Sequence, residues 1–295
     1  MRIILFLVSF TLLSITCRLF AHGVPHQSRS EERSALAEAV DVQETGVPVN
    51  RKSNDRNWGV EATTGWDSRH VHYGVDESGP SGNYVNEVSV QVGNFSFNAW
   101  NGFGLGNDLV EWDFTGAYNL ALGPVFLMPG YNFRYVPSQN DDGHDHGHEA
   151  EHEEGHHEGH GDEHSGGHSH NLYSNEVFLT LGTTAIPYVT PSTVFVWDLN
   201  NTPGVFLECR LDGDVPVYKD VISLQPYALL GLNFGYNTTD AYGLNNFQFG
   251  LQTTCRLWRY ISAFAGINYS VALEALQTIG QENVVWVNVG LTFAY

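Results

Sequence analysis

The final segment of the chain, residues 284–295, restricts the possible folds more than any other part of the sequence. Successive side chains of a β-strand point to opposite faces, so alternate residues of this segment share a face. One face is wholly apolar or aromatic, and it comprises Val285, Val287, Val289, Leu291, Phe293 and Tyr295. It ends on an aromatic side chain, where a membrane barrel places its interfacial girdle. The pattern favours a membrane-barrel strand over the last strand of a soluble sandwich.

Similar alternation recurs from Trp58 onward in segments of about ten residues, and no apolar run reaches the roughly 18 residues that a membrane helix needs. The predicted strands are 58–74, 83–92, 95–102, 110–120, 125–136, 172–183, 193–199, 204–213, 222–236, 244–258, 260–273 and 284–295. An even number of strands closes a barrel with both termini in the periplasm. We therefore predict an all-β fold, a transmembrane antiparallel up-and-down β-barrel of about 12 strands, with eight, ten and fourteen strands as alternatives.

The amino-terminal segments predict export. Residues 1–21 combine Arg2, an apolar core over 3–13 and a cleavage region that ends at Ala21, as a secretory signal peptide does. Cys17 offers lipoprotein processing as an alternative. Residues 22–57 are predicted to be a largely disordered periplasmic segment, with a lumen plug as the alternative. Residues 58–295 are then the barrel, and the predicted location is the cell outer membrane.

A histidine-rich insertion at residues 137–171 interrupts the strand series. A tract of His, Gly and acidic residues cannot bury a core, so a long disordered external loop is expected. Neutral imidazoles on flexible spacers can bind Zn²⁺, Ni²⁺ or Cu²⁺ without fixed spacing, and they release the metal when protonated. A solvated loop without selected affinity is the alternative. The predicted metal ligands are His144, His146, His148, His152, His156, His157, His160, His164, His168 and His170.

The inward faces of the predicted strands carry charges of both signs, with acids in excess. The predicted lumen residues are Glu61, Glu87, Glu111, Asp113, Arg134, Glu176, Glu208, Arg210 and Arg256. An excess of acid favours cations over anions in a pore. Mutual neutralisation, for example of Glu111 and Asp113 by Arg134, is the structural alternative. Several aromatic residues also point inward, so we expect a narrow or partly filled lumen.

Charge and motifs exclude other classes of protein. The net charge of −20 argues against nucleic-acid binding, which needs a basic surface. No Gly-x-Ser-x-Gly or Walker motif is present, and we predict neither an enzyme nor an organic cofactor. His70 and His72 are expected to be girdle residues at a strand end. Cys209 and Cys255 lie on strands predicted to be two apart, about 10 Å, so no disulfide is predicted.

The amphipathic carboxyl-terminal strand with its final Tyr295 resembles that of bacterial outer-membrane β-barrel proteins. In that family the last strand is the signal read by the barrel assembly machinery, so the resemblance implies this machinery as a partner, together with outer-membrane lipid. Residues 65–74, Gly-Trp-Asp-Ser-Arg-His-Val-His-Tyr-Gly, resemble the first strand of the TorF-like porins. This chain departs from that family at His72-Tyr73, where an Arg-Gly pair is commoner, and in its histidine-rich insertion.

These observations predict a porin or channel for small solutes or cations, with an external loop that binds divalent transition metal. The alternative is a non-conducting barrel that anchors a loop for capturing metal or another ligand. A soluble periplasmic β-protein is a third possibility, which extraction without detergent would reveal.

Overall fold

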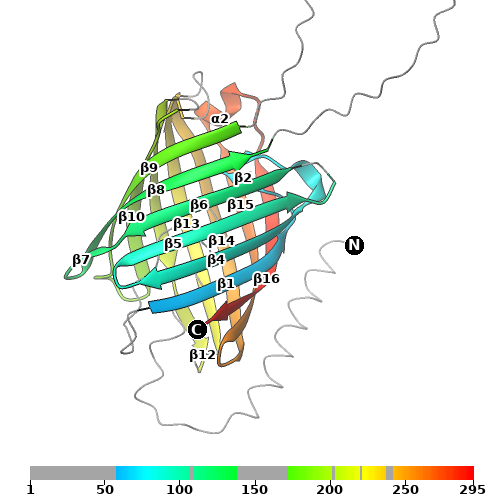
Figure 1. Ribbon diagram of the computed structural model, residues 1–295. Coiled ribbons are helices and arrows are strands. Elements are labelled where there is room, and N and C mark those ends of the chain that lie inside the picture. The colour runs from blue at the N-terminus through cyan, green and yellow to red at the C-terminus, as the bar shows by residue number, and fades with distance from the viewer. Residues whose placement is uncertain (1–57, 107–108, 138–171, 201–202, 220, 237–241) are drawn as a thin grey trace, which may run out of the picture.

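The computed structural model describes residues 58–106, 109–137, 172–200, 203–219, 221–236 and 242–295, which form a closed antiparallel β-barrel (Figure 1). The sheet closes because β1 pairs with β16 and β11 pairs with β13. The barrel strands are β1 (Trp58–Asp67), β4 (Asn83–Val92), β5 (Phe95–Gly104), β6 (Val110–Tyr118), β8 (Val125–Val136), β9 (Leu172–Thr183), β10 (Val189–Asp198), β11 (Gly204–Gly213), β13 (Ile222–Phe234), β14 (Tyr242–Trp258), β15 (Ile261–Ala272) and β16 (Val284–Ala294). These twelve strands confirm the predicted number.

The remaining elements are shorter, and they either extend the sheet or belong to the connections between its strands. They are β2 (Val71–His72), β3 (Val75–Asp76), β7 (Leu120–Leu122), β12 (Val215–Tyr218), the 3-10 helix η2 (Gly79–Ser81) and α2 (Glu274–Thr278). In the described part of the chain, no helix is long and apolar enough to cross a membrane. Figure 1 shows β2 and α2 at one end of the barrel and the carboxyl terminus at the other. We call these ends the outer mouth and the turn end.

Strand β16 has the phase predicted from its alternation. On its outward face Val289 is 42% exposed and Leu291 is 47% exposed. On its inward face Trp286 and Asn288 are only 5% and 2% exposed. Because one residue of slip would exchange the two faces, the apolar alternation determines how β16 pairs with β1 and β15.

The outside of the barrel is apolar around its circumference. Large exposed side chains include Val88, Phe97, Phe114, Val177, Phe195, Leu211, Phe249, Ile267 and Val289. Such a continuous apolar surface is unfavourable in water but matches the hydrocarbon region of a bilayer. At the turn end, the ring of Tyr295 lies 5.7 Å from that of Trp58 and 5.4 Å from that of Tyr260, centroid to centroid. These three rings form the aromatic rim expected there.

The main departure from the predicted strands concerns the first one, which ends at Asp67 rather than at residue 74. Residues 68–82, here called the inner loop, form the β2–β3 hairpin and η2. The chain reverses at Tyr73 and Gly74, which have φ values of 46° and 81°. The alternation continues through this turn in the sequence, which is why the loop read as strand. The prediction of 58–74 as one strand is therefore wrong.

Other boundaries differ by fewer residues. Strand β10 begins at Val189 rather than at residue 193, and the pairing of β12 with β13 lengthens the connection after β11. Cys209 is free, but Cys255 is disulfide-bonded, so the prediction of no disulfide is wrong. A separation of about 10 Å excludes only a bond between Cys209 and Cys255. The predicted signal peptide, the segment 22–57 and the ten predicted metal-binding histidines lie outside the described residues.

Candidate functional site

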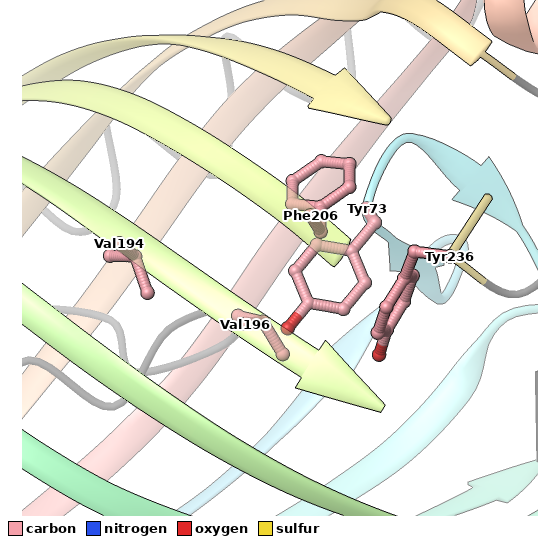
Figure 2. Close-up of a cluster of buried hydrophobic side chains, with 5 residues drawn as sticks. All are labelled: Tyr73, Val194, Val196, Phe206 and Tyr236. Carbon is pink, nitrogen blue, oxygen red and sulfur yellow. The ribbon is translucent and has the colours of Figure 1, made fainter. Parts of the chain in front are cut away.

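The inner loop is held against the barrel wall by aromatic packing. Figure 2 shows the ring of Tyr73 between those of Phe206 and Tyr236, close to Val194 and Val196. The Tyr73 centroid lies 4.4 Å from that of Phe206 and 5.0 Å from that of Tyr236. Tyr73 is 7% exposed, and Phe206 and Tyr236 are each 1% exposed. The loop thus crosses from β1 to the wall formed by β10 and β11.

Close backbone contacts fix the tip of this loop. Asn245 Nδ2 on β14 donates a hydrogen bond of 2.7 Å to the Tyr73 carbonyl oxygen. A Cβ atom added at Gly74 would lie 2.8 Å from Asn246 Cγ and 2.9 Å from Leu276 Cδ1 of α2. Gly74 also has a positive φ, so this position requires glycine for both space and backbone conformation. The tip is therefore seated between β14 and α2.

A charged cluster joins the same loop to β6 and β8. Arg134 Nη2 donates hydrogen bonds to Glu77 Oε2 of the inner loop and, at 3.0 Å, to Glu111 Oε2 of β6. Arg134 Nε lies 2.6 Å from Glu111 Oε1, an ion-pair contact without hydrogen-bond direction. Arg134 Nη1 donates to His72 Nδ1 at 2.8 Å. One guanidinium therefore connects the loop with the wall.

His70 occupies the middle of this cluster. Its Nε2 lies 3.2 Å from Glu111 Oε2 and 3.6 Å from Glu77 Oε2, yet makes no hydrogen bond of suitable direction. Its ring stacks on Trp100 at 5.1 Å between centroids, and the residue is 6% exposed. The prediction that His70 and His72 are girdle residues is wrong, because the inner loop carries both into the lumen, where they are 6% and 8% exposed.

Opposite charges determine the protonation of the loop side chains. Burial lowers the pKa of His70, but the carboxylates of Glu111 and Glu77 outweigh burial and raise it to about 9. Burial raises the pKa of Glu77, but Arg134 and His72 outweigh burial and lower it to about 2. Around neutral pH Glu77 is therefore ionised and His70 is protonated.

All nine predicted lumen residues lie on inward strand faces, as the alternation of side-chain directions along their strands indicates. The structure brings Glu111 and Arg134 together directly and places Asp113 opposite Arg134. At the outer mouth, Arg134 therefore neutralises the charge of Glu111, in agreement with the alternative of mutual neutralisation.

The other predicted lumen residues lie apart from this cluster. Arg210 Nε donates to Asp212 Oδ1 at 2.7 Å, and Nη1 is 4.0 Å from Glu208 Oε1. Glu176 accepts a hydrogen bond from the Tyr236 hydroxyl. Glu87 accepts one from Asn98. Glu61 and Arg256 lie near the turn end, where the strand register places Glu61 opposite Ala294 and Arg256 opposite Ser262.

Sequence reasoning missed three residues that matter here, namely Tyr73, Glu77 and Tyr236. Each was assigned to a strand end or a connection, where pattern alone gives no inward direction. The available signal was a turn: Tyr73-Gly74 precedes Ser78-Gly79-Pro80, and such Gly- and Pro-containing steps mark chain reversals.

Several solved outer-membrane proteins resemble this chain. The KdgM porin has a TM-score of 0.49 at 7% identity, covering 80% of this chain and 99% of that one. The NanC porin has a TM-score of 0.48 at 9% identity, with 79% and 98% covered. The translocator domain of the autotransporter NalP from Neisseria meningitidis has a TM-score of 0.43 at 12% identity, with 82% and 90% covered. Since these TM-scores are below 0.5, the fold assignment rests on this chain's own strand pairing.

The chain matches no family model and no curated protein sequence. Its resemblance to the TorF-like porins therefore stays a prediction.

Proposed function

We propose that this chain is an outer-membrane channel for small solutes or cations, narrowed at its outer mouth by the inner loop. The observation that carries the proposal is the contrast between the two faces of a closed barrel. The outer face is apolar, whereas the inner face carries buried polar side chains such as Gln225, Gln248, Gln252, Thr254, Asn268 and Asn288. A polar interior of this kind is typical of outer-membrane barrels, whose lumen is either a water-filled channel or plugged.

The same surface argues for outer-membrane lipid as the surroundings of the barrel, and the carboxyl-terminal strand for insertion by the barrel assembly machinery. The histidine-rich segment is proposed to collect Zn²⁺, Ni²⁺ or Cu²⁺ outside the mouth. That part of the proposal rests on the sequence, because imidazoles spaced by glycine and acids bind these ions without a fixed geometry.

A non-conducting anchor is the second candidate, and the seating of the inner loop favours it. Aromatic packing at Tyr73 and the contacts of Arg134 both hold the loop across the lumen. Current steps from the purified protein in a planar lipid bilayer would support the channel. Silence over many insertions, verified by a co-inserted porin of known conductance, would support the anchor.

If the barrel conducts, its lumen should prefer cations. Glu87 is the best residue to test, because it faces inward on β4, three strands from Arg134 on β8, whereas replacing Glu111 would also disturb the inner loop. In a salt gradient, the reversal potential should indicate cation preference, and Glu87→Gln should reduce it. Glu282→Gln removes the same charge from an exposed connection and should leave the potential unchanged. Anion preference, unaffected by Glu87→Gln, would contradict the cation assignment.

The histidine-rich segment should bind metal without helping the barrel fold. Ala150 is its only apolar residue between 141 and 170, so the segment has almost nothing to pack on the strands. Deleting residues 144–170 should preserve heat-modifiable migration and remove most Zn²⁺ uptake in calorimetry at about pH 7.5. Lowering the pH to about 5.5 should have a similar effect, because protonated imidazoles release metal. Unchanged Zn²⁺ stoichiometry after the deletion would show that the segment is a solvated spacer.

A further inference from the structure

The outer mouth contains three metal-ligating side chains that converge on one point. His70 Nε2, a Glu77 oxygen and a Glu111 oxygen all lie within 4.8 Å of one another. The two His70-to-carboxylate distances, 3.2 and 3.6 Å, are those between neighbouring ligands of an ion about 2.1 Å from each donor. Donors that surround such a point need little movement to bind an ion there.

The imidazole is the second sign of a ligand site. His70 Nε2 is buried, makes no hydrogen bond and points at the two carboxylates. A buried polar atom without a hydrogen bond is unfavourable, and an ion bound here would replace the proton on this nitrogen, which is released to solvent. Stacking on Trp100 and the backbone hydrogen bond from Glu77 to the His70 carbonyl hold this orientation. The donor nitrogen is therefore preorganised.

We propose that His70, Glu77 and Glu111 form a binding site for one divalent transition-metal ion such as Zn²⁺, which joins the inner loop to β6. One imidazole and two carboxylates are ligands that zinc accepts, and three protein donors leave a fourth position for water. The site is separate from the histidine-rich segment and needs no ion flow, so it holds for a channel and for an anchor.

Arg134 is the competitor that the ion must displace. Its Nη2 contacts Glu77 Oε2 and Glu111 Oε2, the same oxygens that face His70. Because the guanidinium is planar and rigid, Nη2 can leave these oxygens only if the whole group moves, which also changes the contacts of Nε with Glu111 Oε1 and of Nη1 with His72 Nδ1. Competition for the same oxygens predicts that removal of this cation strengthens metal binding.

The test uses the full-length chain with all ten histidines of the segment 144–170 replaced by asparagine. Titration with Zn²⁺ alone should give a stoichiometry of one ion per chain. His70→Asn and Glu77→Gln should each abolish it, and both lie in the inner loop, so the barrel wall stays intact. His72→Asn, the matched control two residues away, should keep it. Co²⁺ should give a visible absorption band of a low-coordinate site that Zn²⁺ removes.

Arg134→Gln distinguishes the metal site from a simple ion-pair network. If the ion replaces Nη2, this variant should bind Zn²⁺ at least about tenfold more tightly, because the buried carboxylates are then left without a compensating cation. Absence of Zn²⁺ binding in the ten-histidine variant would overturn the proposal. Binding that survives both His70→Asn and Glu77→Gln, or that is lost equally in His72→Asn, would overturn it too.

Discussion

Tyr73→Ala should release the inner loop from the barrel wall. The substitution removes a buried ring that packs on Phe206 and Tyr236, and removal of a buried aromatic side chain costs about 3 kcal/mol. The ratio of released to seated loop should therefore rise by roughly a hundredfold. In a planar bilayer the open fraction and the conductance should increase. Independently, trypsin should cut after Arg69 faster, because the inner loop then leaves the lumen.

Phe97→Ala is the matched control for the first experiment. Phe97 is also a large aromatic residue, but it is 55% exposed on the outward face of β5. Its loss should change neither conductance nor cleavage after Arg69. If Tyr73→Ala leaves both measurements at their wild-type values, the inner loop is held by the Arg134 contacts and not by aromatic packing.

Val289→Arg should destabilise the inserted barrel by about 2 to 4 kcal/mol, the cost of a cationic side chain near the middle of the bilayer. Val289 is in the middle of β16, points outward and is 42% exposed, so the arginine would enter the hydrocarbon region. Unfolding in urea from lipid vesicles gives the free energy directly, and loss of heat-modifiable migration supports it.

The control for Val289→Arg must face the lumen without being tightly packed. Asn288, the neighbouring inward residue, does not qualify: it is 2% exposed and donates to Gln252 Oε1 at 3.2 Å, so arginine there would also destabilise. Ser89 is inward, half-buried and close to Glu87. Ser89→Arg should cost much less than Val289→Arg. Equal costs would mean that the outward face does not contact lipid.

The sequence determined the wall of this protein. Alternation along β16 and the other strands specifies which side chains face outward, because a one-residue shift would reverse every side chain. It therefore predicted the closed barrel, the strand number, the apolar exterior and the inward position of residues such as Glu111, Arg134 and Glu208. These features depend on local periodicity, which each strand carries in its own residues.

Only the tertiary structure decided what fills the outer mouth. His70 and His72 follow an alternating pattern like that of a strand, yet the turn at Tyr73-Gly74 carries them across the lumen. Their partners Trp100, Glu111 and Arg134 come from β5, β6 and β8, and Arg134 lies more than 50 residues from Glu77 along the chain. Periodicity describes how a residue is oriented within its own strand. It carries no information on which distant side chains a loop meets after the barrel has closed, so the inner loop and its charged cluster emerge only from the folded chain.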